Sequence, residues 1–455
     1  MLRICDAVRD VDERLATIAR RLKMLYFLNP VNADAERERF WSKKGAYEPR
    51  FRYKPLDFDR DLVRRELYEL RIEDIQDPVL GDLYRRKRWE IDNQLSILDE
   101  RGTENLTFTS EKLFGPMDEQ DVKDAHAILE MDPLPEQRTL SAERVKRMLE
   151  EVVASYTRKA GESFACRVRL RKFLASNAAA GETSVALKTQ KRYSLNDARI
   201  LGVHEVGWHV LTANNGTRQP LQLFAIGLPG FLGTQEGAAL FAEYMSGTLT
   251  VNRLRIIAGR TLAVSLAVQG WRFSETYDYL MRMPHGFDRG DAFTICERAY
   301  RGGLPDRRGQ WHGVYTKDSI YQRYFVRVVT YWRSGLDLRV LSAGKMDLDH
   351  VPMVASAIDQ GVLVPPTFVP SFVADENNLK LRRVVMGLLT QRPSPPAEEP
   401  LPKATATTPK AKKGKKKAAS KRKAAKKRTA AATSAHEQKV RLHVVSGSGA
   451  GSEKP

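Results

Sequence analysis

The segment His-Glu-Val-Gly-Trp-His, residues 204–209, contains residue types that bind metal ions and move protons. In the zinc-peptidase motif H-E-x-x-H, two histidines four residues apart lie on one face of a helix. Here the second histidine follows the first by five residues, which turns the two side chains about 140° apart on a regular α-helix. A local π-turn would remove most of this divergence, and Gly207 makes the helix pliable enough to form one. The spacing therefore permits a shared metal ion only if the helix is locally widened.

Carboxylates occur at the places where a hydrolytic metal site would need them. Glu205 is adjacent to the first histidine, where a general base would act on water. Glu236 is a candidate third ligand in the next helical segment, and Gly237 after it would allow close helix packing. Glu243, seven residues further on, is the alternative ligand or a carboxylate that orients a histidine. The competing interpretation is a pair of half-buried histidines on an amphipathic helix.

The stretches HEVGWHVLTANNGTRQP and GLPGFLGTQEGAALFAEY resemble the QEGLA-motif protein family, described as modulators of flavohemoglobin expression. They also resemble the related microtubule-associated tyrosine carboxypeptidases. The resemblance continues in ERAYRGGLPDRRGQWHGVYTKDSIYQRYF and in YFLNPVNADAERERFW, and it covers roughly residues 20–385. It implies a zinc-peptidase-like core.

By position, the resemblance implies a zinc ion (Zn2+) bound by His204, His209 and Glu236, with Glu205 as the catalytic base. Ala238 stands where the family commonly has leucine, which leaves the ligand in place. The implied function is that of a metallocarboxypeptidase that removes a residue from the C-terminus of a protein or peptide. The alternative is a catalytically silent regulatory protein that keeps the zinc fold and acts by binding.

Such a reaction needs a donor to the developing oxyanion and a cation for the terminal carboxylate of the substrate. The candidate oxyanion donors are Tyr321, Tyr315 and His312. The candidate carboxylate-binding residues are Arg218, which follows the metal helix on a glycine-containing loop, and then Arg298, Arg301 and Lys317. Asn214 and Asn215 either bond the substrate backbone or cap the helix.

The pattern of apolar residues predicts a mostly α-helical α+β protein. Residues 1–115 form a helical N-terminal region, whose first helix runs to about Phe27, and residues 116–390 form the zincin-like catalytic domain. A small sheet between residues 164 and 194 lies beside the metal helix. Thr234 is the expected N-cap of the helix that carries Glu236. Helices then continue to about residue 390.

Residues 391–455 are rich in Lys, Ala and Pro, and we expect them to be disordered. Residues 401–430 contain thirteen Lys or Arg and no acidic residue, so this segment supplies much of the net charge of +19. Residues 403–428 therefore predict non-specific binding to nucleic acid or another polyanion. Three widely spaced cysteines, with no apolar run of membrane length or secretory signal, favour a cytoplasmic location.

Overall fold

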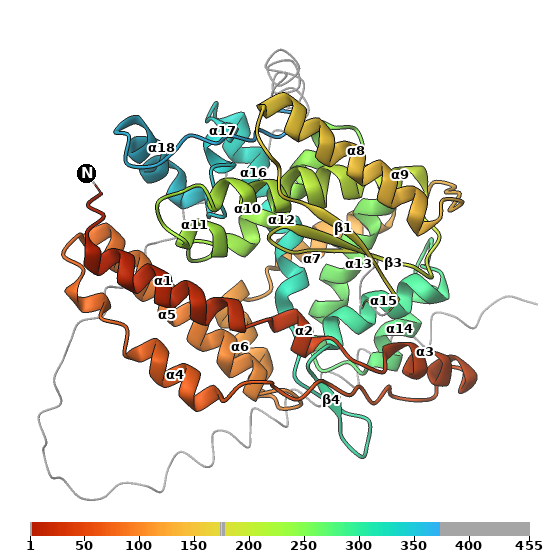
Figure 1. Ribbon diagram of the computed structural model, residues 1–455. Coiled ribbons are helices and arrows are strands. Elements are labelled where there is room, and N and C mark those ends of the chain that lie inside the picture. Colours follow the sequence, from red (N-terminus) through yellow and green to blue (C-terminus); the bar gives the residue numbers. More distant parts are fainter. Residues whose placement is uncertain (1, 173, 175–177, 374–455) are drawn as a thin grey trace, which may run out of the picture. The chain divides into compact units, whose positions relative to one another are not determined.

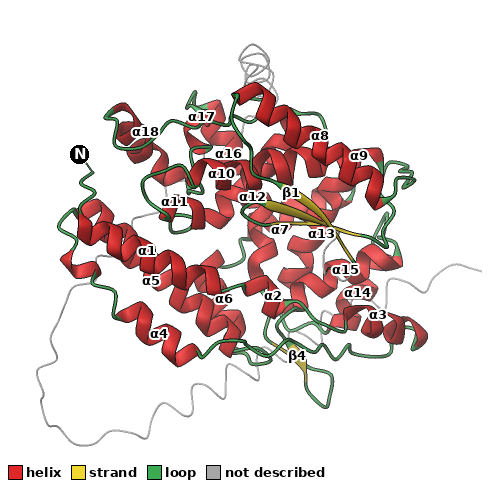
Figure 2. Ribbon diagram, viewed as in Figure 1, coloured by secondary structure: helices red, strands yellow, loops and turns green. Residues whose placement is uncertain are grey.

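Helices form most of the part of the chain that the structure describes, because apolar residues recur at helical spacing along most of its segments (Figures 1 and 2). The computed structural model describes residues 2–172, 174 and 178–373, all of which fall within one compact unit, residues 1–394. The mostly α-helical architecture predicted from the sequence is confirmed. Among the described helices, none combines the length and the hydropathy needed to cross a membrane.

The N-terminal part is a set of helices joined by loops, of which the longest covers residues 43–59. The long first helix expected from the sequence is divided, because Leu22 and Lys23 adopt non-helical backbone angles (ψ of 74° and 65°). The described elements here are α1 (Asp6–Arg21), α2 (Met24–Leu28), α3 (Ala33–Ser42), α4 (Arg60–Tyr68), η1 (Ile72–Asp74), α5 (Pro78–Asp99), α6 (Asn105–Phe114) and α7 (Glu119–Leu129).

A three-stranded sheet follows α8 (Ala142–Ala160). It consists of β1 (Arg167–Arg171), β2 (Ala178–Ala180) and β3 (Ser184–Lys188) in the order β1-β3-β2, with β1 parallel and β2 antiparallel to β3. Val185 and Leu187 of β3 are buried together with Val206 and Val210 of the segment that carries the histidines. The small sheet predicted beside the metal helix is therefore confirmed.

The centre of the unit is α12 (Phe231–Met245), which packs against both α16 (Ile320–Arg333) and η2 (Gly202–Val210). The prediction that Thr234 caps α12 is wrong. The helix begins one turn earlier, after Gly230, and the Thr234 hydroxyl donates to the carboxylate of Asp347 at 2.9 Å. The other helices between residues 189 and 268 are α9 (Leu195–Leu201), α10 (Leu211–Gly216), α11 (Leu223–Ile226) and α13 (Val251–Val268).

The C-terminal part of the described chain adds helices and one short hairpin. The helices are α14 (Phe273–Arg282), α15 (Arg289–Tyr300), η3 (Thr316–Ser319), α17 (Leu338–Leu341), η4 (Leu348–His350) and α18 (Val351–Asp359). The hairpin of β4 (Leu304–Pro305) and β5 (Trp311–His312) was not predicted. Two-residue strands of this kind give no alternating pattern to detect.

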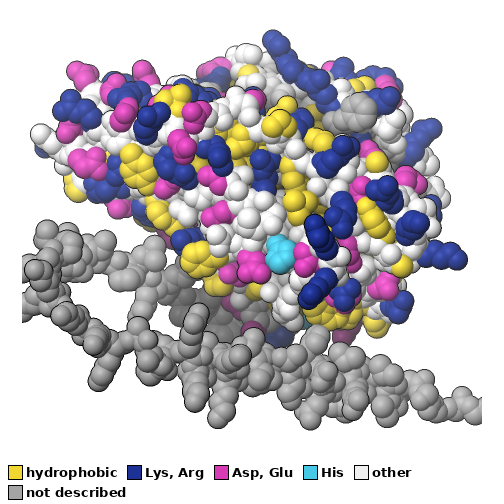
Figure 3. Space-filling view, turned by 90° about the horizontal axis from the view of Figure 1, so that it is seen from below, with side chains coloured by type: hydrophobic (Ala, Val, Ile, Leu, Met, Phe, Trp, Pro, Cys, Tyr) yellow, Lys and Arg dark blue, Asp and Glu magenta, His cyan; other side chains and the backbone are white. Residues whose placement is uncertain are grey.

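One hydrophobic cluster joins the beginning and the end of the described chain, since it includes Val8, Trp208, Phe241 and Phe372. The division of the unit near residue 115 stays a prediction. The basic tail, including residues 403–428, lies outside the described residues. On the face shown in Figure 3, basic and acidic side chains of the described part lie intermingled.

Candidate metal centre

The segment that carries the two histidines is a π-helix. It follows α9, which begins with a capping box between Ser194 and Asp197, and it spans Gly202–Val210 as η2. Because its hydrogen bonds run from residue i to i+5, five residues make close to one full turn. His204 and His209 consequently lie side by side, with ring centroids 4.8 Å apart and an interplanar angle of 79°. The local widening predicted from the histidine spacing is confirmed.

Gly207 allows η2 to pack closely against α8. A Cβ atom at this position would lie 3.1 Å from the carbonyl oxygen of Gly202 and 3.1 Å from the hydroxyl oxygen of Tyr156. Both distances are shorter than comfortable van der Waals contacts. The glycine therefore provides space as well as the pliability expected from the sequence.

The third donor group comes from α12. Oε2 of Glu236 lies 3.7 Å from Nε2 of His204 and 3.7 Å from Nε2 of His209. The next residue, Gly237, lets α12 reach this position, because a Cβ atom there would lie 2.4 Å from the backbone C and O atoms of Tyr324 in α16. The close packing predicted for Gly237 is confirmed.

The three side chains suit a zinc ion. Their donor atoms all lie within 4.8 Å of one another, and ligands of a tetrahedral zinc, at bond lengths of about 2.0–2.1 Å, are separated by about 3.3 Å. The two 3.7 Å separations are therefore close to those of a coordinated set. Two imidazoles and one carboxylate also leave a fourth position open, as in catalytic rather than structural zinc sites.

Each histidine is held through its other ring nitrogen. Nδ1 of His204 lies 2.7 Å from Oε1 of Glu243, and Nδ1 of His209 lies 3.3 Å from Oε1 of Gln235. An acceptor at Nδ1 favours the tautomer with its proton there, which leaves the lone pair of Nε2 available on the side of Glu236. Of the two roles that the sequence left open for Glu243, the geometry supports that of the orienting carboxylate.

The carboxylates make the centre attractive to positive charge. Burial acts to lower the pKa of His204, but Glu236 and Glu243 outweigh it and raise that pKa to about 9. Burial acts to raise the pKa of Glu236, but Lys317 and the two histidines hold it well below its usual value. The Glu236 carboxylate is therefore anionic at neutral pH, and a divalent cation would be stabilised by the same field.

Two of the predicted substrate-site residues lie next to Glu236. Nζ of Lys317 is 2.6 Å from Oε1 of Glu236 and 3.5 Å from the hydroxyl oxygen of Tyr321. Lys317 thus binds one carboxylate oxygen while the other faces the histidines. Burial, and then the charge of Glu236, raise the pKa of Tyr321. Its hydroxyl therefore remains a hydrogen-bond donor at neutral pH.

Glu205 is partly exposed, and within the described residues its carboxylate has no hydrogen bond or ion pair. Burial acts to lower the pKa of Arg253, and Glu243, Tyr321 and Glu205 act to raise it. Glu205 therefore lies within electrostatic range of Arg253. A carboxylate without a competing partner is what proton transfer requires.

Arg218 follows the π-helix closely in the sequence but contacts a different region. Its guanidinium pairs with Glu162 at 3.0 Å and lies 4.7 Å from the ring centre of Phe368. Asn214 and Asn215 are both buried and bond the backbone of neighbouring segments. These contacts hold η2 and α10 in place, and they do not bring Arg218 to the histidine–carboxylate cluster.

The remaining predicted candidates also have partners. Arg298 forms a two-point ion pair with Asp318. Arg301 donates to the backbone oxygen of Arg298 and to the side-chain oxygen of Asn29, each at 3.1 Å. His312, in β5, pairs with acidic side chains outside the cluster. Their roles in substrate binding stay predictions.

Gln235 and Arg253 were not among the site residues predicted from the sequence. Gln235 precedes Glu236, and its position next to a predicted ligand was the available signal. Arg253 donates to both carboxylate oxygens of Glu243, at 2.9 and 3.0 Å. No pattern in the sequence connects Arg253 with Glu243, because their contact depends on how α12 and α13 pack.

Comparison with known families gives a match over most of this unit. A sequence model of the family described as microtubule-associated tyrosine carboxypeptidase matches residues 38–386. The matched range includes both histidines, Glu205 and Glu236. A comparison with curated proteins gives no match. The relation to the carboxypeptidases is thereby confirmed, and the relation to the QEGLA-motif proteins stays a prediction.

Proposed function

Because the chain belongs to the microtubule-associated tyrosine carboxypeptidase family, we propose that it is a zinc-dependent carboxypeptidase that removes the C-terminal residue of a protein or peptide. The observation that supports this most is the convergence of His204, His209 and Glu236 next to a carboxylate, Glu205, that has no other partner among the described residues. The three free cysteines agree with a reducing compartment such as the cytoplasm.

The proposed reaction assigns separate roles to the residues around the cluster. A zinc ion bound there would supply Lewis acidity, which polarises the scissile carbonyl and activates water. Glu205 accepts a proton from the attacking water and then delivers it to the leaving amine. Glu243 and Gln235 keep the two imidazoles in the required tautomer and orientation.

Tyr321 is the proposed donor to the oxygen that becomes negative as water adds to the carbonyl. It is buried near Glu236, and its raised pKa keeps the hydroxyl protonated. Lys317 holds Glu236 through Oε1 and leaves Oε2 for the metal. Donors in a buried site of this kind stabilise developing charge more strongly than water does.

The family description names tyrosine as the residue removed, so peptides that end in tyrosine are the first substrates to test. The protein is incubated with zinc and a peptide set in which the terminal residue is varied, and products are identified by mass spectrometry. We expect loss of single C-terminal residues with the wild type and not with Glu205→Gln. Glu151→Gln, a change on an exposed part of α8, is the matched control and should cleave normally.

The alternative of a catalytically silent regulatory protein predicts a different result in the same experiment. Such a protein would bind zinc and peptide but release no terminal residue, and Glu205→Gln would change nothing. The absence of a competing partner for Glu205 within the described residues supports the enzyme instead.

A further inference from the structure

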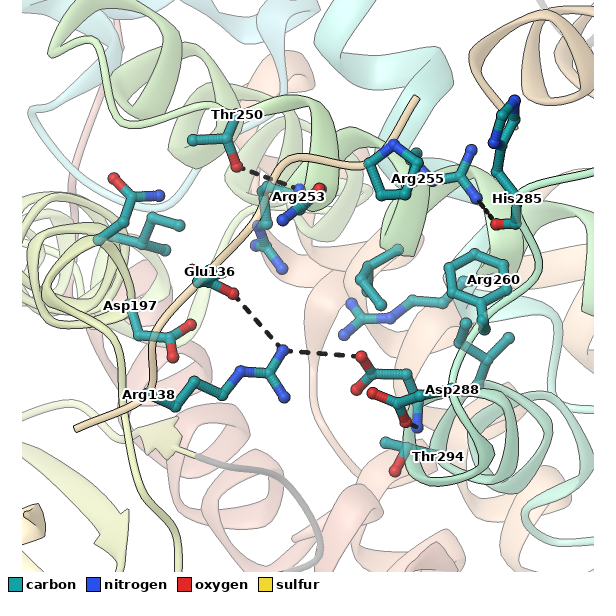
Figure 4. A pocket seen from close by; sticks show the side chains of 18 of the residues that line it. Glu136, Arg138, Asp197, Thr250, Arg253, Arg255, Arg260, His285, Asp288 and Thr294 are labelled. Atoms are coloured by element: carbon teal, nitrogen blue, oxygen red, sulfur yellow. Dashed lines mark hydrogen bonds and ion pairs between the residues drawn. The ribbon is translucent and has the colours of Figure 1, made fainter. Parts of the chain in front are cut away.

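A cavity of about 450 Å³ lies between α9, α13, α15 and the segment that precedes α8 (Figure 4). The side chains of Arg138, Arg253 and Arg260 extend into it from different sides. The volume is within the range of cavities that hold small ligands or single amino-acid residues. Four carboxylates, those of Glu136, Asp197, Asp288 and Asp291, line the same cavity. A guanidinium group that these carboxylates do not bind would favour an anionic ligand.

Two chains of contacts connect this cavity to the metal centre. On one side, Arg253 donates to Glu243, which holds His204. On the other side, the Arg260 guanidinium lies 5.8 Å from the ring centre of Tyr321, whose hydroxyl is next to the Lys317 that binds Glu236. The cavity therefore adjoins the cluster through α13, from which both arginines project two turns apart.

Arg260 differs from the other arginines of the cavity in its lack of partners. Its Nε atom is buried without a hydrogen-bond partner, and its guanidinium forms no ion pair with any described residue. Burial, and then the nearby charge of Arg298, lower the pKa of Arg260 to about 9, so the group is still cationic at neutral pH. Asp318 is within electrostatic range of Arg260, but its carboxylate is bound by Arg298. An anion in the cavity would therefore relieve the cost of holding Arg260 there.

The neighbouring guanidinium groups are already neutralised or bonded. Arg138 pairs with Glu136 and Asp291, at 3.5 and 3.6 Å. Arg255 donates to backbone carbonyl oxygens, among them that of His285 (Figure 4). Arg253 is bound to Glu243, as described above. Among the described arginines that line the cavity, Arg260 alone has its donors free.

We propose that Arg260 binds the α-carboxylate of the substrate's C-terminal residue and that the cavity accommodates that residue. The inference rests on the proposed function, since it is the carboxypeptidase reaction that requires a bound terminal carboxylate. That carboxylate lies one residue, about 4 Å of chain, beyond the scissile bond. The Arg260 guanidinium lies over the ring of Tyr321. Its parallel N–H groups, which can bind both oxygens of a carboxylate, are therefore next to the tyrosine that donates to the scissile carbonyl oxygen in the proposed reaction.

The test measures binding rather than turnover, so it does not depend on hydrolysis. Fluorescent peptides with varied terminal residues, each prepared as the free acid and as the C-terminal amide, are titrated with zinc-loaded Glu205→Gln protein. We expect the free acid of the best peptide to bind about 10- to 100-fold more tightly than its amide, the range for hydrogen bonds to a charged group. Adding Arg260→Gln should abolish this preference by weakening only the free acid.

Three further variants make the result specific. Arg260→Lys keeps the charge but loses the two-point geometry, so it should retain part of the preference. Arg282→Gln removes an exposed arginine that pairs with Asp278, and the preference should be unchanged. Arg218→Gln tests the residue first favoured from the sequence, and it too should leave the preference intact. Thermal unfolding of each variant checks that the fold is retained.

The inference is overturned if free acids and amides bind equally to the Glu205→Gln protein, including the case in which neither binds. It is also overturned if Arg218→Gln abolishes the preference and Arg260→Gln does not. If the preference depends on Arg260 while the wild type cleaves no peptide, the carboxylate site stands and the proposed hydrolase function falls.

Discussion

Nδ1 of His204 lies 2.7 Å from Oε1 of Glu243, a carboxylate that is completely buried. Glu243 is in turn bound by the guanidinium of Arg253. Burial acts to raise the pKa of Glu243, but Arg253 and His204 lower it, so it carries its negative charge at neutral pH. The position of His204, the first proposed ligand, therefore depends on the ion pair between Glu243 and Arg253, and Arg253 also lines the neighbouring cavity.

Replacing this carboxylate should weaken metal binding without removing a ligand. We expect Glu243→Gln to lower zinc affinity about 10- to 100-fold, the usual effect of losing a partner that orients a histidine ligand. Competition with a chromophoric chelator measures the affinity. Glu205→Gln is the control, because it should leave zinc affinity unchanged.

Removal of the metal should lower stability as well as activity. The purified protein should contain about one zinc ion per chain, measured by elemental analysis, and His204→Ala or His209→Ala should contain much less. A chelator should lower the free energy of unfolding by about 2.7 kcal/mol if the protein had been held in zinc at about 100 times its dissociation constant. Protein that is equally stable with and without zinc, and free of it when purified, would contradict the metal centre.

The hydroxyl of Tyr321 should matter for the rate and not for metal binding. We expect Tyr321→Phe to lower kcat about 100-fold, as for other donors to a developing oxyanion, with zinc content and thermal stability close to those of the wild type. Tyr315→Phe tests the competing tyrosine from the same segment, and it should reduce kcat much less. The reverse order of effects would transfer the role to Tyr315.

The contact between α12 and α16 should be sensitive to a single methyl group. In Gly237→Ala the new Cβ would lie 2.4 Å from backbone atoms of Tyr324, which cannot rotate away. We expect a loss of about 1–3 kcal/mol in the free energy of unfolding, measured with urea, together with weaker zinc binding because Glu236 is adjacent. Gly81→Ala, at a buried position of α5 where the nearest atom to the new Cβ would be the movable guanidinium of Arg85 at 3.3 Å, is the matched helix control and should be neutral or slightly stabilising.

Stability should fall in mild acid because of His350. Burial, and then the charge of Arg86, lower its pKa from 6.5 to about 4. Between these two values the unfolded chain binds a proton that the folded protein does not. His350 therefore leaves the free energy of unfolding unchanged above pH 6.5. As the pH falls from 6.5 towards 4, it lowers that free energy by about 1.4 kcal/mol per pH unit. Urea unfolding at pH 7.5 to 5 should show a shallower pH dependence for His350→Asn than for the wild type, and equal slopes would contradict the assignment.

Local features of the site were predictable from the sequence because they depend on neighbouring residues. The five-residue spacing of His204 and His209 permits a common ligand only on a widened helix, and η2 is such a helix. Gly237 signalled a close helix contact, and it makes one. Glu236 was a candidate because it lies in the next helical segment, and the family resemblance then implied it as a ligand, since a spacing of this length does not by itself indicate a contact.

Features that depend on tertiary packing were not predictable in this way. The free guanidinium of Arg260 is recognised only when the partners of its neighbours are known, and those partners come from α12, α15 and loops distant in the sequence. Arg218 was favoured for its closeness along the chain, and the fold pairs it with Glu162. Thr234 had the composition of a cap, but α12 gains another turn before it.

The widened turn of η2 also decides how the residues that follow it are directed. On a regular α-helix one extra residue would rotate the downstream side chains by about 100°, and the π-turn absorbs most of that rotation. In α10, Asn214 accordingly meets the backbone of Ala165, which leads into β1, and Asn215 meets the backbone of Phe368. If η2 took up regular α-helical hydrogen bonding with all its residues present, both asparagines would be misdirected, so the turn that brings the two imidazoles together also anchors two segments that are distant in the sequence.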